Sequence, residues 1–160
     1  MLIRQANEDE MLALWGETTD NMRPTTAFFY ENVKNNNAKF WTCDKDGELV
    51  GELYAFMALD DKDFADGEDK AYLCDFRITE ELRGKGYGTR LFSHVINCLK
   101  GEGIKIVTIG VDETGEVNIR LYHRLGFMDK IKDCNVDPCD VDENMQAKPC
   151  RKFWLLKREI

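Results

Sequence analysis

The sequence has no run of about 18 apolar residues, the length that a membrane-spanning helix requires. Its first residues, MLIRQANEDEM, include one arginine but no apolar core behind it, so a secretory signal is not predicted either. Internal repeats and low-complexity tracts are also missing. These absences predict a cytoplasmic protein without a membrane partner.

A concentrated basic patch is missing as well. The chain has 30 acidic and 22 basic residues, and its net charge of −8 repels the phosphates of a nucleic acid. The acidic residues gather in residues 60–69 and between Asp133 and Glu143. No nucleic-acid partner is therefore predicted, whereas a cationic small molecule is compatible with this charge.

The six cysteines form no CxxC pair, and neither histidine lies near the three cysteines between residues 134 and 150. The spacings that zinc sites require are therefore missing, and no metal is predicted. Cys74 and Cys98 lie in apolar strand-like and helix-like runs. Because no export signal is present either, reduced thiols are expected rather than disulfides.

The length of 160 residues predicts a single domain over residues 1–160, long enough to bury a substantial core, and the hydrophobic pattern predicts both strands and helices in it. Asn7 and Glu10 have the spacing of a capping box at the start of a helix. Asp46-Gly47 is typical of a hairpin turn. The expected strands are 2–6, the two arms of the hairpin 39–59, 71–78, 104–111, 127–132 and 151–159, and the expected helices are 8–15, 25–37, 89–100 and 118–125. The connection 134–150 is predicted to be an acidic loop.

The stretch RGKGYGTRLF, residues 83–92, places three glycines at every second position before a helical apolar pattern. Glycine permits positive φ and close approach, while a helix N-terminus presents unpaired N–H groups and partial positive charge. This combination favours a phosphate group, although three glycines alone fit an ordinary helix start equally well. A Walker loop needs a longer glycine spacing, and Thr89 stands where a dinucleotide fingerprint needs glycine, so neither motif is predicted.

Two motifs follow one another in a fixed order. Arg83-x-x-Gly86-x-Gly88 comes after a strand ending at Ile78, and Leu121-Tyr122 is followed by Gly126-Phe127. Together they resemble the GNAT superfamily of acetyl-CoA-dependent N-acetyltransferases. The resemblance implies an α/β (α+β) fold with a mixed, mostly antiparallel central sheet, flanked by helices, whose two central strands splay apart.

The resemblance also implies acetyl-CoA as co-substrate, with its diphosphate on the amides of the glycine turn and its pantetheine arm in the splay. The implied cofactor-binding residues are Phe76, Ile78, Arg83, Gly84, Lys85, Gly86, Tyr87, Gly88, Thr89 and Asn118. Asn118 departs from the family pattern, which often has asparagine where this chain has Gly115. An N-cap or surface role for Asn118 is nearly as well supported.

In the implied reaction, a primary amine of a small molecule or peptide attacks the acetyl thioester directly. Tyr122 matches the family's acid, because a phenol with a pKa of about 10 is protonated at neutral pH; the alternative is a core tyrosine. Asp75, on the polar face of strand 71–78, is the candidate base; the alternative is an ion pair with Arg77, and Glu52 is the second candidate. The alternative function is a non-catalytic acyl-CoA-binding regulatory module.

The acceptor amine and the oligomeric state stay open, with a homodimer among the options. The resemblance places the connection 134–150 beside the acceptor channel. Its carboxylates, at Asp137, Asp140, Asp142 and Glu143, favour a cationic amine. A solvated acidic loop is equally compatible with the sequence.

Overall fold

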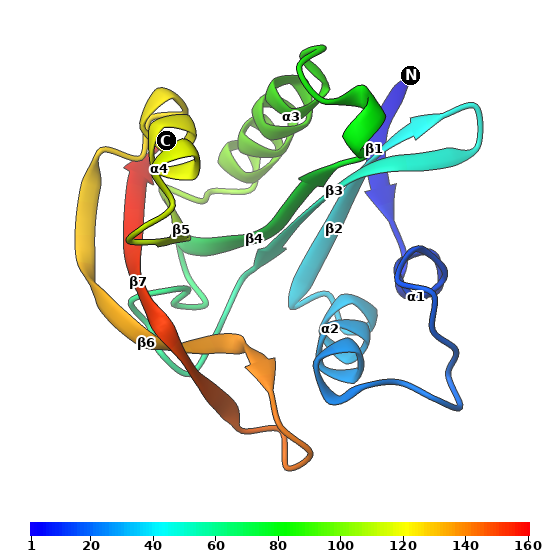
Figure 1. Ribbon diagram of the computed structural model, residues 1–160, viewed down its shortest axis with the longest axis horizontal. Helices are drawn as coiled ribbons and strands as arrows, with labels where there is room; N and C mark the ends of the chain where they lie inside the picture. Colours follow the sequence, from blue (N-terminus) through cyan, green and yellow to red (C-terminus); the bar gives the residue numbers. More distant parts are fainter.

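The computed structural model describes residues 1–160. Its seven-stranded sheet has the order β1-β2-β3-β4-β5-β7-β6, with α3 and α4 on one face and α1 and α2 on the other (Figure 1). The strands are β1 (Leu2–Ala6), β2 (Ala38–Lys45), β3 (Glu48–Phe56), β4 (Lys70–Ile78), β5 (Ile106–Asp112), β6 (Asp129–Val141) and β7 (Ala147–Glu159). The helices are α1 (Glu8–Leu14), α2 (Pro24–Lys34), α3 (Tyr87–Gly101) and α4 (Glu116–Arg124), with a 3₁₀ turn, η1, at Glu80–Leu82. The predicted mixed, mostly antiparallel sheet is confirmed, since only β4 and β5 pair in parallel.

The first two helices begin at local sequence signals. The predicted capping box is present, because Asn7 Oδ1 accepts from the Glu10 amide at 2.9 Å and Glu10 Oε1 accepts from the Asn7 amide at 3.2 Å. Pro24 opens α2, where a missing N–H costs nothing, and α2 ends at Lys34, before the asparagines. None of the four helices has the length and apolar character that crossing a membrane requires.

Each central strand contributes side chains to two cores, one on each face of the sheet. On β3, Leu53 and Ala55 pack in the cluster that contains α3, whereas Tyr54 and Phe56 pack in the cluster that contains α1 and α2. This alternation follows from the two-residue period of a strand. The sheet is therefore covered by helices on both faces near its middle.

The parallel pairing of β4 with β5 is short. It runs from Lys70↔Ile106 to Leu73↔Ile109 and includes no residue beyond these. After Leu73, β4 continues beside β3, while β5 continues beside β7. The backbone of β4 after Leu73 is thus free on the side that faces β5, which is where the resemblance predicts the splay.

The prediction of a loop over residues 134–150 is wrong. Most of this stretch belongs to β6 and β7, which form one long hairpin with a turn at residues 142–146 (Figure 1). Three register shifts accommodate the irregular residues of β6, and Pro149 stands opposite Val136. Cys134 and Cys139 are buried in the core on the α1 and α2 face. The prolines and acids resemble a loop in sequence, but the buried cysteines keep the strand against the core.

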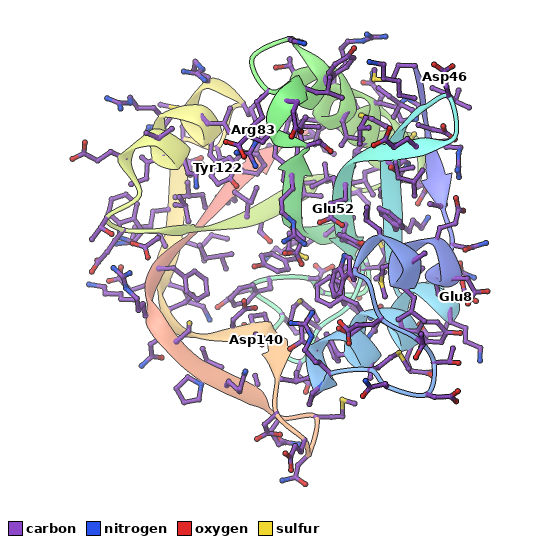
Figure 2. All side chains as sticks on the ribbon, turned by 45° about the vertical axis from the view of Figure 1, so that its right-hand side comes forward. Glu8, Asp46, Glu52, Arg83, Tyr122 and Asp140 are labelled. Carbon is purple, nitrogen blue, oxygen red and sulfur yellow. The ribbon has the colours of Figure 1, made fainter.

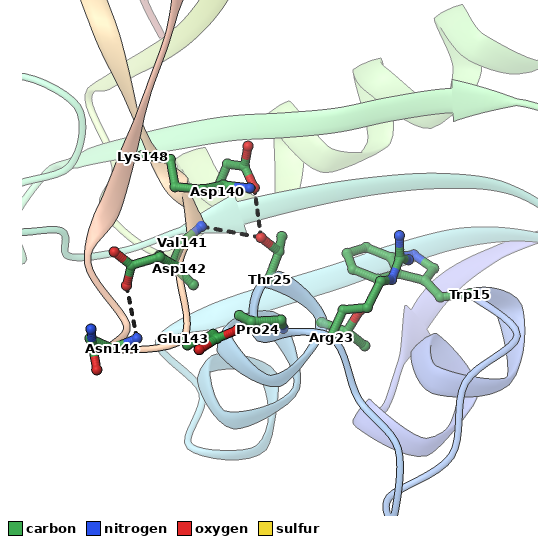
Figure 3. A pocket seen from close by; sticks show the side chains of 11 residues that line it. Trp15, Arg23, Pro24, Thr25, Asp140, Val141, Asp142, Glu143, Asn144 and Lys148 are labelled. Carbon is green, nitrogen blue, oxygen red and sulfur yellow. Dashed lines mark hydrogen bonds and ion pairs between the residues drawn. The ribbon is translucent and has the colours of Figure 1, made fainter.

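The tip of the hairpin is held to the start of α2. Thr25 Oγ1 donates to Asp140 Oδ1 at 2.7 Å and accepts from the Val141 amide at 3.1 Å (Figure 3). These contacts join residues that are 115 and 116 positions apart in the sequence. They fix the acidic end of β6 beside the face of β4 that carries Asp75.

Candidate active site

The glycine turn before α3 presents a row of free backbone donors. Gly84 and Gly86 have φ of 75° and 87°, and a Cβ at either position would meet nothing within 4 Å. No backbone amide from Gly84 to Thr89 donates to a backbone carbonyl, and no side chain caps α3. Adjacent free amides at a helix N-terminus attract an anion, and the open space before them leaves room for one.

This turn opens onto a cavity of about 540 Å³ between the end of β4 and α4, which we call the glycine cavity. Its lining comprises Phe76, Arg77, Ile78, Leu82, Arg83, Gly84, Gly86, Gly88, Thr89, Val117, Asn118, Leu121, Tyr122 and Leu125. The structure therefore brings together eight of the ten residues that the resemblance implies for the cofactor, and Tyr122 with them. Lys85 and Tyr87 are outside the lining, although their backbone amides are also free of backbone partners. The glycine pattern gives no signal for Arg77, Leu82 or Val117, which the sequence analysis missed.

Gly88 and Arg83 have roles that differ from those of the other turn residues. A Cβ at Gly88 would lie 3.4 Å from Phe76 Cζ and 3.5 Å from Ile78 Cγ1, which is ordinary van der Waals contact, so Gly88 faces β4 rather than open space. The Arg83 side chain folds back, because its Nε donates to the Ile78 carbonyl at 2.9 Å. That carbonyl is thus already engaged within the chain.

On the other face of β4, a bulge displaces Asp75. Glu52 of β3 pairs with Arg77 of β4, and Tyr54 pairs with Cys74. Two β4 residues, Asp75 and Phe76, therefore stand opposite the one β3 residue between Glu52 and Tyr54. Asp75 adopts a left-handed conformation with φ of 50°, which aspartate tolerates better than most residues. Asp75 lines two cavities, a larger one that Trp15 and Glu52 also line and a smaller one on the side of α2 and the hairpin.

The smaller of these two cavities, of about 300 Å³, lies between β4, β5, α2 and the hairpin, and we call it the hairpin cavity. Its lining comprises Thr25, Phe29, Tyr72, Leu73, Cys74, Asp75, Phe76, Ile109, Gly110, Tyr122, Asp137, Cys139 and Asp140. Phe76 and Tyr122 line this cavity and the glycine cavity as well. Figure 2 shows Tyr122 near Arg83, with Asp140 on the hairpin beyond it. The two cavities therefore adjoin at Phe76 and Tyr122.

The pKa values of Tyr122 and Asp75 are both raised, which decides the protonation state of each group at neutral pH. Burial, and next the negative charge of Asp75, raise the pKa of Tyr122 above its usual value, so the phenol keeps its proton. Burial raises the pKa of Asp75 to about 6; the charge of Arg77 opposes this shift, and the nearby carboxylates Glu52, Asp137 and Asp140 add to it. At neutral pH, Asp75 is therefore an ionised group that accepts a proton readily.

The ion pair of Asp75 with Arg77 exists but is long. Arg77 Nη2 lies 3.7 Å from Asp75 Oδ1, whereas Arg77 Nε donates to Glu52 Oε1 at 2.5 Å. The main ion-pair partner of Arg77 is therefore Glu52. Asp75 keeps an accessible carboxylate beside Tyr122.

Glu52, the second candidate base, is occupied by structural contacts. Its side chain is only 8% exposed and accepts from Trp15 Nε1 at 3.0 Å, from the Tyr54 hydroxyl at 3.1 Å and from Arg77. These donors come from the C-terminal end of α1, from β3 and from β4. Glu52 thus joins three elements, and its lone pairs are already used.

We expect Glu52→Gln to lower the free energy of unfolding by about 2 kcal/mol, because the buried donors lose a charged acceptor. Urea denaturation followed by tryptophan fluorescence measures this loss. Glu48→Gln is the matched control, since Glu48 lies exposed on the same strand. Equal stability of the Glu52 and Glu48 variants would contradict the structural role of Glu52.

Comparison with known proteins gives one family. A model of the Acetyltransferase (GNAT) family matches residues 3–127. An uncharacterized N-acetyltransferase of Methanocaldococcus jannaschii is 30% identical over 105 residues, which cover 64% of this chain and 45% of that protein. The L-methionine sulfoximine/L-methionine sulfone acetyltransferase of Pseudomonas aeruginosa is 23% identical over 115 residues, covering 72% of this chain and 64% of that protein.

A solved structure shows the same fold. The GNAT family acetyltransferase from Elizabethkingia anophelis, solved with acetyl-CoA bound, has a TM-score of 0.61 at 16% sequence identity. The similarity covers 99% of this chain and 97% of that one. By contrast, the chain spans less than two thirds of the length of either curated relative.

Proposed function

Because the chain belongs to the GNAT acetyltransferase family, we propose that it is an N-acetyltransferase that moves the acetyl group of acetyl-CoA to a primary amine. One observation carries this proposal: the glycine cavity and the hairpin cavity lie on opposite sides of β4 and adjoin at Phe76 and Tyr122. A co-substrate entering from the glycine turn and an acceptor entering from the hairpin side then meet at one point.

The residues of the glycine cavity fit acetyl-CoA. The free amides from Gly84 to Thr89 match a diphosphate, and the positive φ of Gly84 and Gly86 turns the backbone without a side chain in the way. Phe76 and Asn118 line the continuation of the cavity toward Tyr122, where a pantetheine arm would lie. Acetyl-CoA, when bound, supplies an acetyl thioester at that end.

Asp75 and Tyr122 then divide the proton transfers. Asp75 accepts a proton from the attacking amine, whose nitrogen forms a bond to the thioester carbonyl carbon while the carbon–sulfur bond breaks. Tyr122 donates its phenolic proton to the departing sulfur. The raised pKa of Tyr122 keeps this proton available, and the pKa of about 6 at Asp75 leaves its carboxylate ionised at neutral pH.

A thiol-release assay tests this proposal. The protein is incubated with acetyl-CoA and a panel of primary amines, and free CoA is measured together with binding of acetyl-CoA by calorimetry. Amine-dependent release of CoA supports the N-acetyltransferase. Binding of acetyl-CoA without thiol release on any amine would instead support the regulatory module, which the free hydroxyl of Tyr122 at the junction of the two cavities does not favour.

We expect Gly86→Ala to weaken acetyl-CoA binding about tenfold, because the new side chain enters the space before the amides and disturbs their direction. Calorimetric titration measures the dissociation constant. Gly103→Ala is the matched control: Gly103 has φ of 92° and equally empty surroundings, but lies beyond the C-terminus of α3. The two variants share the cost of a side chain at positive φ, about 1 kcal/mol. Equal affinities in both would contradict the diphosphate site.

A further inference from the structure

We propose that the acceptor is a small diamine or polyamine, whose reacting amine lies in the hairpin cavity and whose second cationic group lies at the acidic tip of the hairpin. This inference rests on the proposed function and specifies its acceptor.

The first argument is the charge of the hairpin cavity. Asp75, Asp137 and Asp140 line it, and no lysine or arginine does. Asp137 has no ion pair, and its carboxylate accepts from backbone amides alone, those of Cys139, at 2.9 Å, and Asp140. Burial, and to a smaller extent the charge of Asp140, raise the pKa of Asp137, while the Cys139 amide opposes this shift. Of the three carboxylates, Asp137 alone has no cation beside it, since Asp75 has Arg77 at 3.7 Å and Asp140 has Lys148 at 3.4 Å. A bound ammonium group supplies the cation that Asp137 lacks.

The second argument is a polar group without a partner. Tyr72 is only 5% exposed, and its hydroxyl takes part in no hydrogen bond within the chain. Every fully enclosed polar side-chain atom has a partner, so the Tyr72 hydroxyl must touch the open space of the cavity. A Cβ on Gly110 would lie 3.3 Å from this hydroxyl and 3.2 Å from the Phe153 ring, so the side toward Gly110 is closed and the hydroxyl is reached from the open space of the cavity. An amine N–H in that space satisfies the hydroxyl oxygen.

The third argument is a groove beside the hairpin cavity, in which the far end of a bound acceptor would lie. This groove is a further cavity, of about 590 Å³, that shares Thr25 and Asp140 with the hairpin cavity. Asp142 and Glu143, at the tip of the hairpin, also line it (Figure 3). Its two cations are already paired, Arg23 with Glu17 at 2.8 Å and Lys148 with Asp140 at 3.4 Å. Glu143 forms no ion pair. A second ammonium group that extends past Asp140 toward the tip therefore meets negative charge there.

A matched series of four-carbon amines tests this. 1,4-Diaminobutane, butylamine and 4-aminobutanoate share one primary amine and differ only in the far end, which is cationic, neutral or anionic. At pH 8, where Asp75 is ionised, we expect kcat/KM to fall about tenfold from the diamine to butylamine, because one charged contact is lost. For 4-aminobutanoate we expect a further fall, because attraction at the tip is replaced by repulsion. Equal or higher kcat/KM for 4-aminobutanoate would overturn the inference.

Direct binding separates this inference from the proposed function. Calorimetry without acetyl-CoA should show that Asp137→Asn and Tyr72→Phe each weaken binding of 1,4-diaminobutane about fivefold or more. Tyr72→Phe should leave stability unchanged, because the hydroxyl has no partner to lose. Asp129→Asn, the same charge change on an exposed part of β6 outside the cavity, should bind like the wild type.

The outcomes differ for the two proposals. If another amine is acetylated and 1,4-diaminobutane does not bind, or if the Asp137 variant binds it as well as the wild type, the acceptor inference is wrong and the enzyme assignment stands. If the diamine binds through Asp137 and Tyr72 but no amine releases CoA, the ligand class stands and the N-acetyltransferase assignment fails.

Discussion

Replacement of Tyr122 by phenylalanine is expected to lower kcat by about 10²- to 10³-fold, the usual contribution of one positioned proton donor. The ring, which packs between the two cavities, is preserved, and only the hydroxyl is lost. The dissociation constant of acetyl-CoA should therefore stay nearly unchanged. Steady-state release of CoA at saturating amine measures kcat, and calorimetry measures the dissociation constant.

Tyr30→Phe is the control for this variant, because Tyr30 lies on α2, away from both cavities, and loses only a 3.3 Å hydrogen bond to Asp9. Its kcat should match that of the wild type. An unchanged kcat in the Tyr122 variant across the pH range would mean that the thiolate leaves without a proton from Tyr122.

Asp75→Asn should have the second large effect, a fall in kcat/KM of about 10²-fold at pH 8 from the loss of the general base. The wild type provides an independent signature. Because the pKa of Asp75 is raised to about 6, its carboxylate is ionised above pH 6 and protonated below it. The kcat/KM of the wild type should therefore rise with pH through about 6, and this limb should vanish in the variant.

A good control for the backbone exists in the chain. Asp46 has φ of 54°, close to the 50° of Asp75, and lies in the exposed turn between β2 and β3. Asparagine tolerates this conformation, so Asp46→Asn shows what the substitution alone does. A limb near pH 6 that persists in the Asp75 variant would assign the base to another group.

Local signals in the sequence were sufficient for much of the fold. The capping box at Asn7 and Glu10, the Asp46-Gly47 turn and the apolar period of α3 each depend on residues within a few positions of one another. The glycine turn is predictable for the same reason, because the residues that indicate positive φ and those that indicate a helix start are consecutive. Tyr122 lies in a second such motif, and the structure places it in the same cavity as the turn.

The hairpin side of the site could not be predicted in this way. The position of Asp137 and Asp140 beside Asp75 depends on contacts with Thr25, more than 100 residues away, and on three register shifts in β6. The bulge at Asp75 has no sequence signal, because aspartate is common in ordinary strand ends and turns. Whether the Tyr72 hydroxyl has a hydrogen-bond partner depends on the residues that pack against it in the folded chain, and the sequence pattern does not predict these contacts.

The long hairpin has a consequence for how such an enzyme changes over time. The glycine turn, Asp75 and Tyr122 all lie within residues 3–127, whereas Asp137, Asp140 and the acidic tip lie in the 31 residues from Asp129 to Glu159, after the matched region. The residues proposed for acetyl transfer thus lie in the matched stretch, whereas the carboxylates proposed to attract the far end of the acceptor lie in the hairpin. Under the proposed assignment, exchange of the hairpin is expected to change the preference for the far end of the amine and to leave the glycine turn unaltered.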